Sequence, residues 1–215
     1  MGAEEPVQIG SDLLLVHEGT SDLHVLGSLM RHSRIEGFQT LSLDGHDAQK
    51  LRRFFKGLAA SPHFTSLVPG FASPVRSLAI VLDAESDATK TFEEIREALM
   101  AANLPVPLGP GRISDELPHV GVFLLPDNES AGMIETLCLR SVQDDPAWNC
   151  IDELFECLRR QLGTLPTNPD KARAQAFLST RPRPNLPVGL AALEGYWRFD
   201  SQAFEPLVGF LRALS

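Results

Sequence analysis

The sequence predicts an α/β fold: a mostly parallel, four-stranded sheet flanked by helices, with a C-terminal helical extension. In the first 125 residues, short apolar runs alternate with segments whose apolar residues recur every three or four positions. This alternation of strands and helices is typical of parallel sheets that carry helices on both faces. After about residue 130 only the helical spacing continues, which indicates the extension.

Each expected element follows from a local pattern. Residues 13–16 and 78–82 are continuous apolar runs, as in strands buried on both faces, whereas 38–43 alternates in polarity. A fourth strand is expected within 119–129. The expected helices are 21–32, 46–61, 89–103, 132–142, 146–162, 169–180 and 201–214. Proline-rich and glycine-containing segments at 62–74, 104–111 and 180–189 predict loops. We expect an α/β domain over 1–142 and a helical extension over 143–215, packed together as one structural unit.

The composition limits the class of function. The 215 residues include 19 Lys and Arg against 28 Asp and Glu, a formal charge of −9, which argues against broad, non-specific binding to nucleic acid. No apolar run approaches the length of a membrane span, and the acidic first residues do not resemble a signal peptide. We therefore expect a cytoplasmic protein with no membrane contact.

The three cysteines predict free thiols. They form no Cys-x-x-Cys metal motif, and their odd number fits a reducing compartment better than a disulfide framework. Cys150 and Cys157 lie seven residues apart on an expected helix, and we expect both to pack in the core.

Acidic residues follow three of the four expected strands. Glu18 follows the first strand, Asp83 the third, with Glu85 and Asp87 close behind, and Asp127 the fourth. Ligands of open parallel sheets bind outside the carboxyl ends of the strands. Converging carboxylates repel one another unless a cation neutralises them, and ligand sets of oxygen alone suit Mg²⁺ or Mn²⁺. The sequence thus predicts an acidic metal site at this edge of the sheet.

Several of these residues have two interpretations. Either Glu85 or Asp87 is the second ligand from its segment, and the other is the N-cap of the next helix. Asp22 either stabilises the start of its helix or supports the site from behind. Asp127 either supports the site or forms a Pro-Asp-Asn turn. Gly19 allows a sharp turn after Glu18 and leaves room for a ligand.

Two segments resemble the motifs of the Toprim superfamily. "LLLVHEGTSDLHVLGSLM" (13–30) is similar to its Glu-Gly motif and "LAIVLDAESDATKTFEEIREAL" (78–99) to its Asp-x-Asp motif. The superfamily includes catalytic domains of topoisomerases and primases, and nucleases of the overcoming-lysogenization type. Segments 120–139 and 171–214 resemble an uncharacterised bacterial Toprim-like family, so the resemblance spans about residues 12–214. It implies a Toprim-like, Rossmann-like sheet.

The resemblance also implies roles for individual residues. Glu18 matches the Toprim glutamate, a general acid/base or metal ligand, and Asp83 matches the first aspartate. Glu85 stands where the second aspartate is expected and reaches one methylene further, so Asp87 could compensate. Glu135 matches a family acid and is a further candidate metal ligand. Lys171 is a candidate because related nucleases use a lysine late in the chain.

Two functions follow as hypotheses. The first is a Mg²⁺-dependent phosphodiester hydrolase (nuclease) or related phosphotransfer enzyme, which acts on nucleic acid or a nucleotide phosphate and works with an ATPase partner. Its expected catalytic residues are Glu18, Asp83 and Glu85. The alternative is a non-catalytic Toprim-like regulatory or scaffolding subunit, which the departure at Glu85 and the shortage of basic residues favour.

Overall fold

The sheet of the computed structural model has the predicted class and connectivity. The structure describes residues 9–61, 64 and 75–215, so the expected loop at 62–74 lies almost wholly outside the described residues. All strand pairings are parallel, and the strand order is β2-β1-β3-β4. The α/β prediction is therefore confirmed. The strands are β1 Leu13–His17, β2 Phe38–Ser42, β3 Ser77–Asp83 and β4 His119–Leu125.

The helices also follow the predicted order, with one addition. A short helix that begins at the end of the expected proline-rich connection (180–189) and continues beyond it was not predicted; it begins directly after Pro187, whose fixed backbone angle suits a helix start. The helices are α1 Thr20–Ser33, α2 Ala48–Ala59, α4 Ala88–Ala101, α5 Ile134–Arg140, α6 Pro146–Leu162, α7 Pro169–Ser179, α8 Val188–Leu193 and α9 Glu205–Leu214, with a 3₁₀ turn η1 at Gln202–Phe204.

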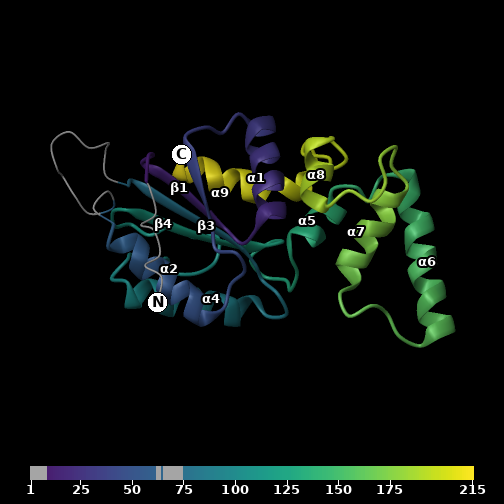
Figure 1. The fold of residues 1–215 in the computed structure, drawn as a ribbon, viewed down its shortest axis with the longest axis horizontal. Coiled ribbons are helices and arrows are strands. Elements are labelled where there is room, and N and C mark those ends of the chain that lie inside the picture. Colours follow the sequence, from purple (N-terminus) through teal and green to yellow (C-terminus); the bar gives the residue numbers. More distant parts are fainter. Residues whose placement is uncertain (1–8, 62–63, 65–74) are drawn as a thin grey trace, which may run out of the picture.

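The sheet is buried on both faces, and each face has its own apolar cluster. Along β3, Leu78, Ile80 and Leu82 face α2 and α4, whereas Ala79 and Val81 face the cluster of α1, α8 and α9 (Figure 1). This alternation follows from the two-residue period of a strand. The cluster around Ala79 and Val81 includes residues of both β1 and α9, so one core crosses the expected boundary at residue 142.

The order of the strands creates a crevice where the candidate residues lie. β1 has β2 on one side and β3 on the other, because the chain reverses its direction across the sheet after β2. At such a switch point the connections leave toward opposite faces and open a space outside the carboxyl ends of the two central strands. Glu18 directly follows β1, and Asp83 is the last residue of β3.

Helix α6 lies at the periphery, beside α7 (Figure 1). It buries Ile151 and Phe155, whereas Cys150 and Cys157 are exposed free thiols. The prediction that both cysteines pack in the core is wrong, because their side of α6 faces away from α7. Within the described residues, none of the helices combines the length and the apolar character that crossing a membrane requires.

Candidate metal centre

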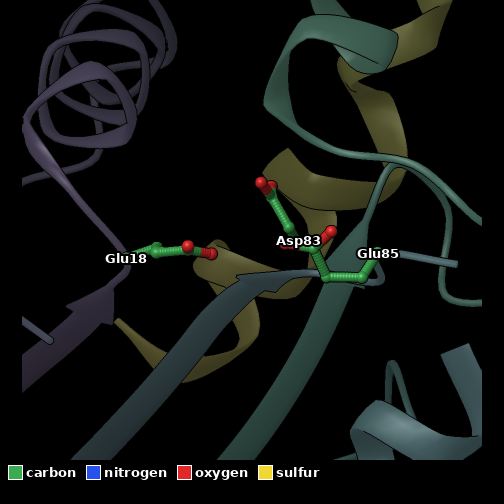
Figure 2. Close-up of side chains that lie close together, drawn as sticks. All are labelled: Glu18, Asp83 and Glu85. Carbon is green, nitrogen blue, oxygen red and sulfur yellow. The ribbon is translucent and has the colours of Figure 1, made fainter. Parts of the chain in front are cut away.

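Three carboxylates converge at the switch point. Glu18, Asp83 and Glu85 each present an oxygen, and the three oxygens lie within 4.8 Å of one another. Figure 2 shows the Glu18 side chain reaching from the end of β1 toward the two acids that follow β3. Three ligand atoms at this separation can surround one cation.

Glu85 reaches the cluster through an unusual backbone conformation. Its φ of 55° lies in the left-handed region, which a residue with a side chain adopts at a cost of about 1–2 kcal/mol. Two backbone hydrogen bonds with Gly132, of 3.0 and 2.8 Å, hold it there. A Cβ at position 132 would lie 2.8 Å from Oγ1 of Thr136, so this close pairing requires glycine. Strained residues of this kind cluster at functional sites.

A cleft of about 310 Å³ opens beside the cluster. Six of the predicted residues line it, and Glu85 is not among the lining residues. The six are Glu18, Gly19, Asp22, Asp83, Glu135 and Lys171. Residues from the turns after β1 and β2 and from the starts of α5 and α7 thus meet in one space.

Among the acids that line the cleft, Asp83 has the pKa that is shifted furthest from its ordinary value. It is only 8% exposed, and its Oδ1 accepts one hydrogen bond, 2.9 Å long, from the backbone N–H of Ile134. Burial, together with the neighbouring charges of Asp22 and Glu18, raises its pKa to about 9. Without a cation, Asp83 therefore carries a proton at neutral pH.

Asp22 stabilises the start of α1 and also lines the cleft. Its Oδ2 accepts a 2.9 Å hydrogen bond from the backbone N–H of Gly19 and so stabilises the start of α1. Its Oδ1 is buried and has no partner among the described residues. Burial, with a contribution from Glu18, raises the pKa of Asp22 to about 6. A buried oxygen without a donor is costly, and a cation or proton in the cleft would satisfy it.

Glu18 is held in its charged form. Its Oε2 lies 2.8 Å from Nδ1 of His46, and this hydrogen bond lowers the pKa of Glu18. Burial acts to lower the pKa of His46, but the contact with Glu18 outweighs it and raises the pKa. Sequence reasoning missed His46, because the histidines show no ligand spacing. The one available signal was its place in "LDGHD", which follows β2 at the same edge of the sheet.

Asp87 and Asp127 lie outside the cluster and the cleft. Asp87 is the N-cap of α4 and accepts a 3.1 Å hydrogen bond from the backbone N–H of Lys90. Glu85 is therefore the member of that pair that joins the cluster. Asp127 accepts hydrogen bonds from its own turn and from Arg140. Burial opposes them, but together they hold the pKa of Asp127 well below its usual range.

Glu135 and Lys171 approach the cleft from the helical part of the chain. Glu135 lies in the first turn of α5 and is only 9% exposed; burial raises its pKa, and Lys171 opposes that shift. A 2.6 Å hydrogen bond from Thr136 to Asp170 ties α5 to α7 and so brings Lys171 to the cleft. The side chain of Lys171 remains exposed.

A family of proteins of unknown function, DUF3226, matches residues 11–215. The chain belongs to the DUF3226 family. No curated protein matches it, and no solved structure does. The DUF3226 match covers every element from β1 to α9, so both sides of the cleft lie within one family unit.

The donor set of this DUF3226 protein fits a small divalent cation. All three clustered ligand atoms are carboxylate oxygens, the atoms that Mg²⁺ and Mn²⁺ bind most readily. Burial is the main cause of the raised pKa values of Asp83 and Asp22, and neighbouring carboxylates add to it. A cation bound among these carboxylates would favour their charged forms.

Proposed function

We propose that this DUF3226 protein is a metal-dependent phosphodiester hydrolase, or a related phosphotransfer enzyme, of the Toprim-like type. The observation that carries the proposal is the convergence of Glu18, Asp83 and Glu85 within 4.8 Å at the switch point of a parallel sheet. The buried, unpartnered oxygen of Asp22 beside them supports it. So does the resemblance of the Glu-Gly and Asp-x-Asp segments to the Toprim motifs.

In this proposal Glu18, Asp83 and Glu85 hold Mg²⁺ or Mn²⁺, with Glu135 as a further ligand. The bound ion supplies stabilisation of the charged phosphate oxygens and favours deprotonation of water. Water attacks phosphorus, and the P–O ester bond breaks. The water gives its proton to solvent, and the leaving oxygen keeps the electron pair of the broken bond. In the alternative role of Glu18, its carboxylate accepts the proton of the attacking water instead of binding the ion. Lys171 at the rim can contact a phosphate oxygen.

The shortage of positive charge limits which substrates the chain can bind without a partner. Lys171 is the single cation among the described residues that line the cleft, and the whole chain carries −9. A long nucleic acid would therefore need a basic binding surface on another protein, and we propose that this protein is an ATPase partner. A nucleotide phosphate would need no such surface. We place the protein in the cytoplasm, which its three free cysteines support.

The proposal is tested with a panel of phosphodiesters at millimolar Mn²⁺ or Mg²⁺: single-stranded and duplex DNA, RNA, and bis(p-nitrophenyl) phosphate. Metal-dependent cleavage should disappear in Glu18→Ala and Asp83→Ala. Glu129→Gln is the matched control, since Glu129 also follows a strand but lies outside the cleft. Cleavage by both alanine variants at the parental rate would refute the proposal.

A non-catalytic regulatory or scaffolding subunit is the second candidate. The observation that favours it is Glu85, which replaces the expected aspartate and is exposed. The two candidates separate when Mn²⁺ binding and cleavage are measured on the same sample. Binding without cleavage of any substrate in the panel would support the regulatory subunit.

A further inference from the structure

The loop between β2 and α2 holds Glu18 by two hydrogen bonds. The backbone N–H of Gly45 donates one to the main-chain oxygen of Glu18, at 3.1 Å. The other joins Nδ1 of His46 to Oε2 of the carboxylate, at 2.8 Å. Both the backbone and the side chain of Glu18 are therefore fixed from one neighbouring segment.

The loop that carries His46 is held by contacts on both sides of this residue. Asp44 and Gly45 both have positive φ, at 51° and 85°, which turns the chain sharply back toward β1. Lys50 Nζ donates a 2.9 Å hydrogen bond to the carbonyl oxygen of Asp44, and Asp47 caps α2 on the other side of His46. The His46 side chain is only 5% exposed.

The hydrogen bond with His46 makes the two carboxylate oxygens of Glu18 inequivalent. An ionised carboxylate only accepts hydrogen bonds, so Nδ1 of His46 carries the proton in this pair. Oε2 is thereby engaged. Among the described residues, Oε1 accepts no hydrogen bond, and the Glu18 side chain points toward Asp83 and Glu85. Glu18 therefore offers one oxygen to a cation.

We propose that His46 determines the metal specificity of the site: by engaging Oε2, it restricts Glu18 to ligation through a single oxygen. Mg²⁺ and Mn²⁺ take few protein oxygens in strict octahedral geometry, whereas Ca²⁺ takes six to eight ligands and readily accepts both oxygens of one carboxylate. Engaging Oε2 therefore favours the smaller ions over Ca²⁺. This inference rests on the proposed function in that it requires a cation between Glu18, Asp83 and Glu85.

The test is the ratio of Mn²⁺ to Ca²⁺ affinity, measured by calorimetry on the full chain without substrate. His46→Phe keeps a ring in the buried space but removes the N–H, and His46→Asn keeps an N–H donor near the position of Nδ1. Groups that orient metal ligands contribute about 10–100-fold in affinity. We expect His46→Phe to lower the Mn²⁺/Ca²⁺ ratio by at least about 10-fold, and His46→Asn to restore most of it.

A matched control is His119→Ala. His119 also hydrogen-bonds through Nδ1, at 3.1 Å to the carbonyl oxygen of Ser114, but it begins β4, whose opposite end faces the site. Its affinity ratio should equal that of the parent. Thermal unfolding without metal checks the folding of each variant, and His46→Ala replaces His46→Phe if the phenylalanine does not fit.

Different results separate the two proposals. If the parent binds Mn²⁺ and His46→Phe keeps its Mn²⁺/Ca²⁺ ratio, the specificity role of His46 is overturned while the metal site stands. Equal weakening of both ions, without rescue by His46→Asn, overturns it as well. If the parent binds neither ion, the metal site falls and this inference falls with it.

Discussion

The aspartates at the carboxyl ends of β3 and β4, Asp83 and Asp127, have opposite surroundings. The two strands pair along their whole length, from Ser77 with His119 to Asp83 with Leu125, and acids follow both. Asp127 receives donors from its own turn and from Arg140, whereas Asp83 receives one backbone N–H and otherwise faces carboxylates. Asp127 is therefore satisfied by the fold, whereas Asp83 is the acid whose charged form a bound cation would stabilise. The neighbours of an acid, rather than its place after a strand, decide its use.

The carboxyl ends of β3 and β4 should differ most in how their aspartates make the free energy of unfolding depend on pH. Asp83 has a pKa of about 9 when folded, against an ordinary 3.8, so between these values the folded chain binds more protons than the unfolded chain. The contribution of Asp83 to stability without metal is therefore fully present below its ordinary pKa and is lost as the pH rises toward 9. We expect a loss of about 3 kcal/mol from about pH 6 to about pH 9 that Asp83→Asn removes. Urea unfolding in a chelator measures it, and the same slope in both proteins would contradict the account.

Metal should stabilise the protein through the β3 end and not through the β4 end. At about 100 times its Kd, a ligand that binds only the folded chain adds about 2.7 kcal/mol to the free energy of unfolding. Asp83→Ala should lose this gain completely, and Asp127→Ala should keep it. Thermal unfolding with and without Mn²⁺ makes the comparison. A full Mn²⁺ gain in Asp83→Ala would break the distinction between the two strand ends.

The cost of losing Asp127 should be structural. Asp127→Ala removes the acceptor for two backbone N–H groups and for Arg140, so we expect a loss of about 1–2 kcal/mol in unfolding free energy. The parent and the variant should bind Mn²⁺ with equal affinity. Weaker Mn²⁺ binding in a folded Asp127→Ala would show that the β4 end also serves the site.

The smallest change in stability and Mn²⁺ affinity is expected for a substitution of Asp87, in contrast to Glu85. Asn caps helices about as well as Asp, so Asp87→Asn should change stability by only a few tenths of a kcal/mol and leave Mn²⁺ affinity unchanged. Glu85→Gln removes a charge from the cluster and should weaken Mn²⁺ binding. Calorimetry on the two variants tests this, and a larger loss of affinity in Asp87→Asn would reverse the assignment.

The sheet could be predicted because its strands are short apolar runs, and Glu18 and Asp83 could be paired because parallel strands end at one edge. The choice between Glu85 and Asp87 could not be predicted. It depends on a left-handed residue held by Gly132, which lies 47 positions along the chain. His46 escaped notice for a similar reason, since its partner Glu18 lies on a turn 28 residues earlier. The two interpretations of Asp127 could not be separated, because a strand-end pattern does not show that Arg140 faces it.

The proposed function requires a cation between the ends of β1 and β3. Anomalous diffraction from crystals soaked in Mn²⁺ locates such an ion without any assumption about activity. We expect a peak in contact with Glu18, Asp83 and Glu85. A fully soaked crystal with no peak there, or with its strongest peak beside Asp127, would contradict it.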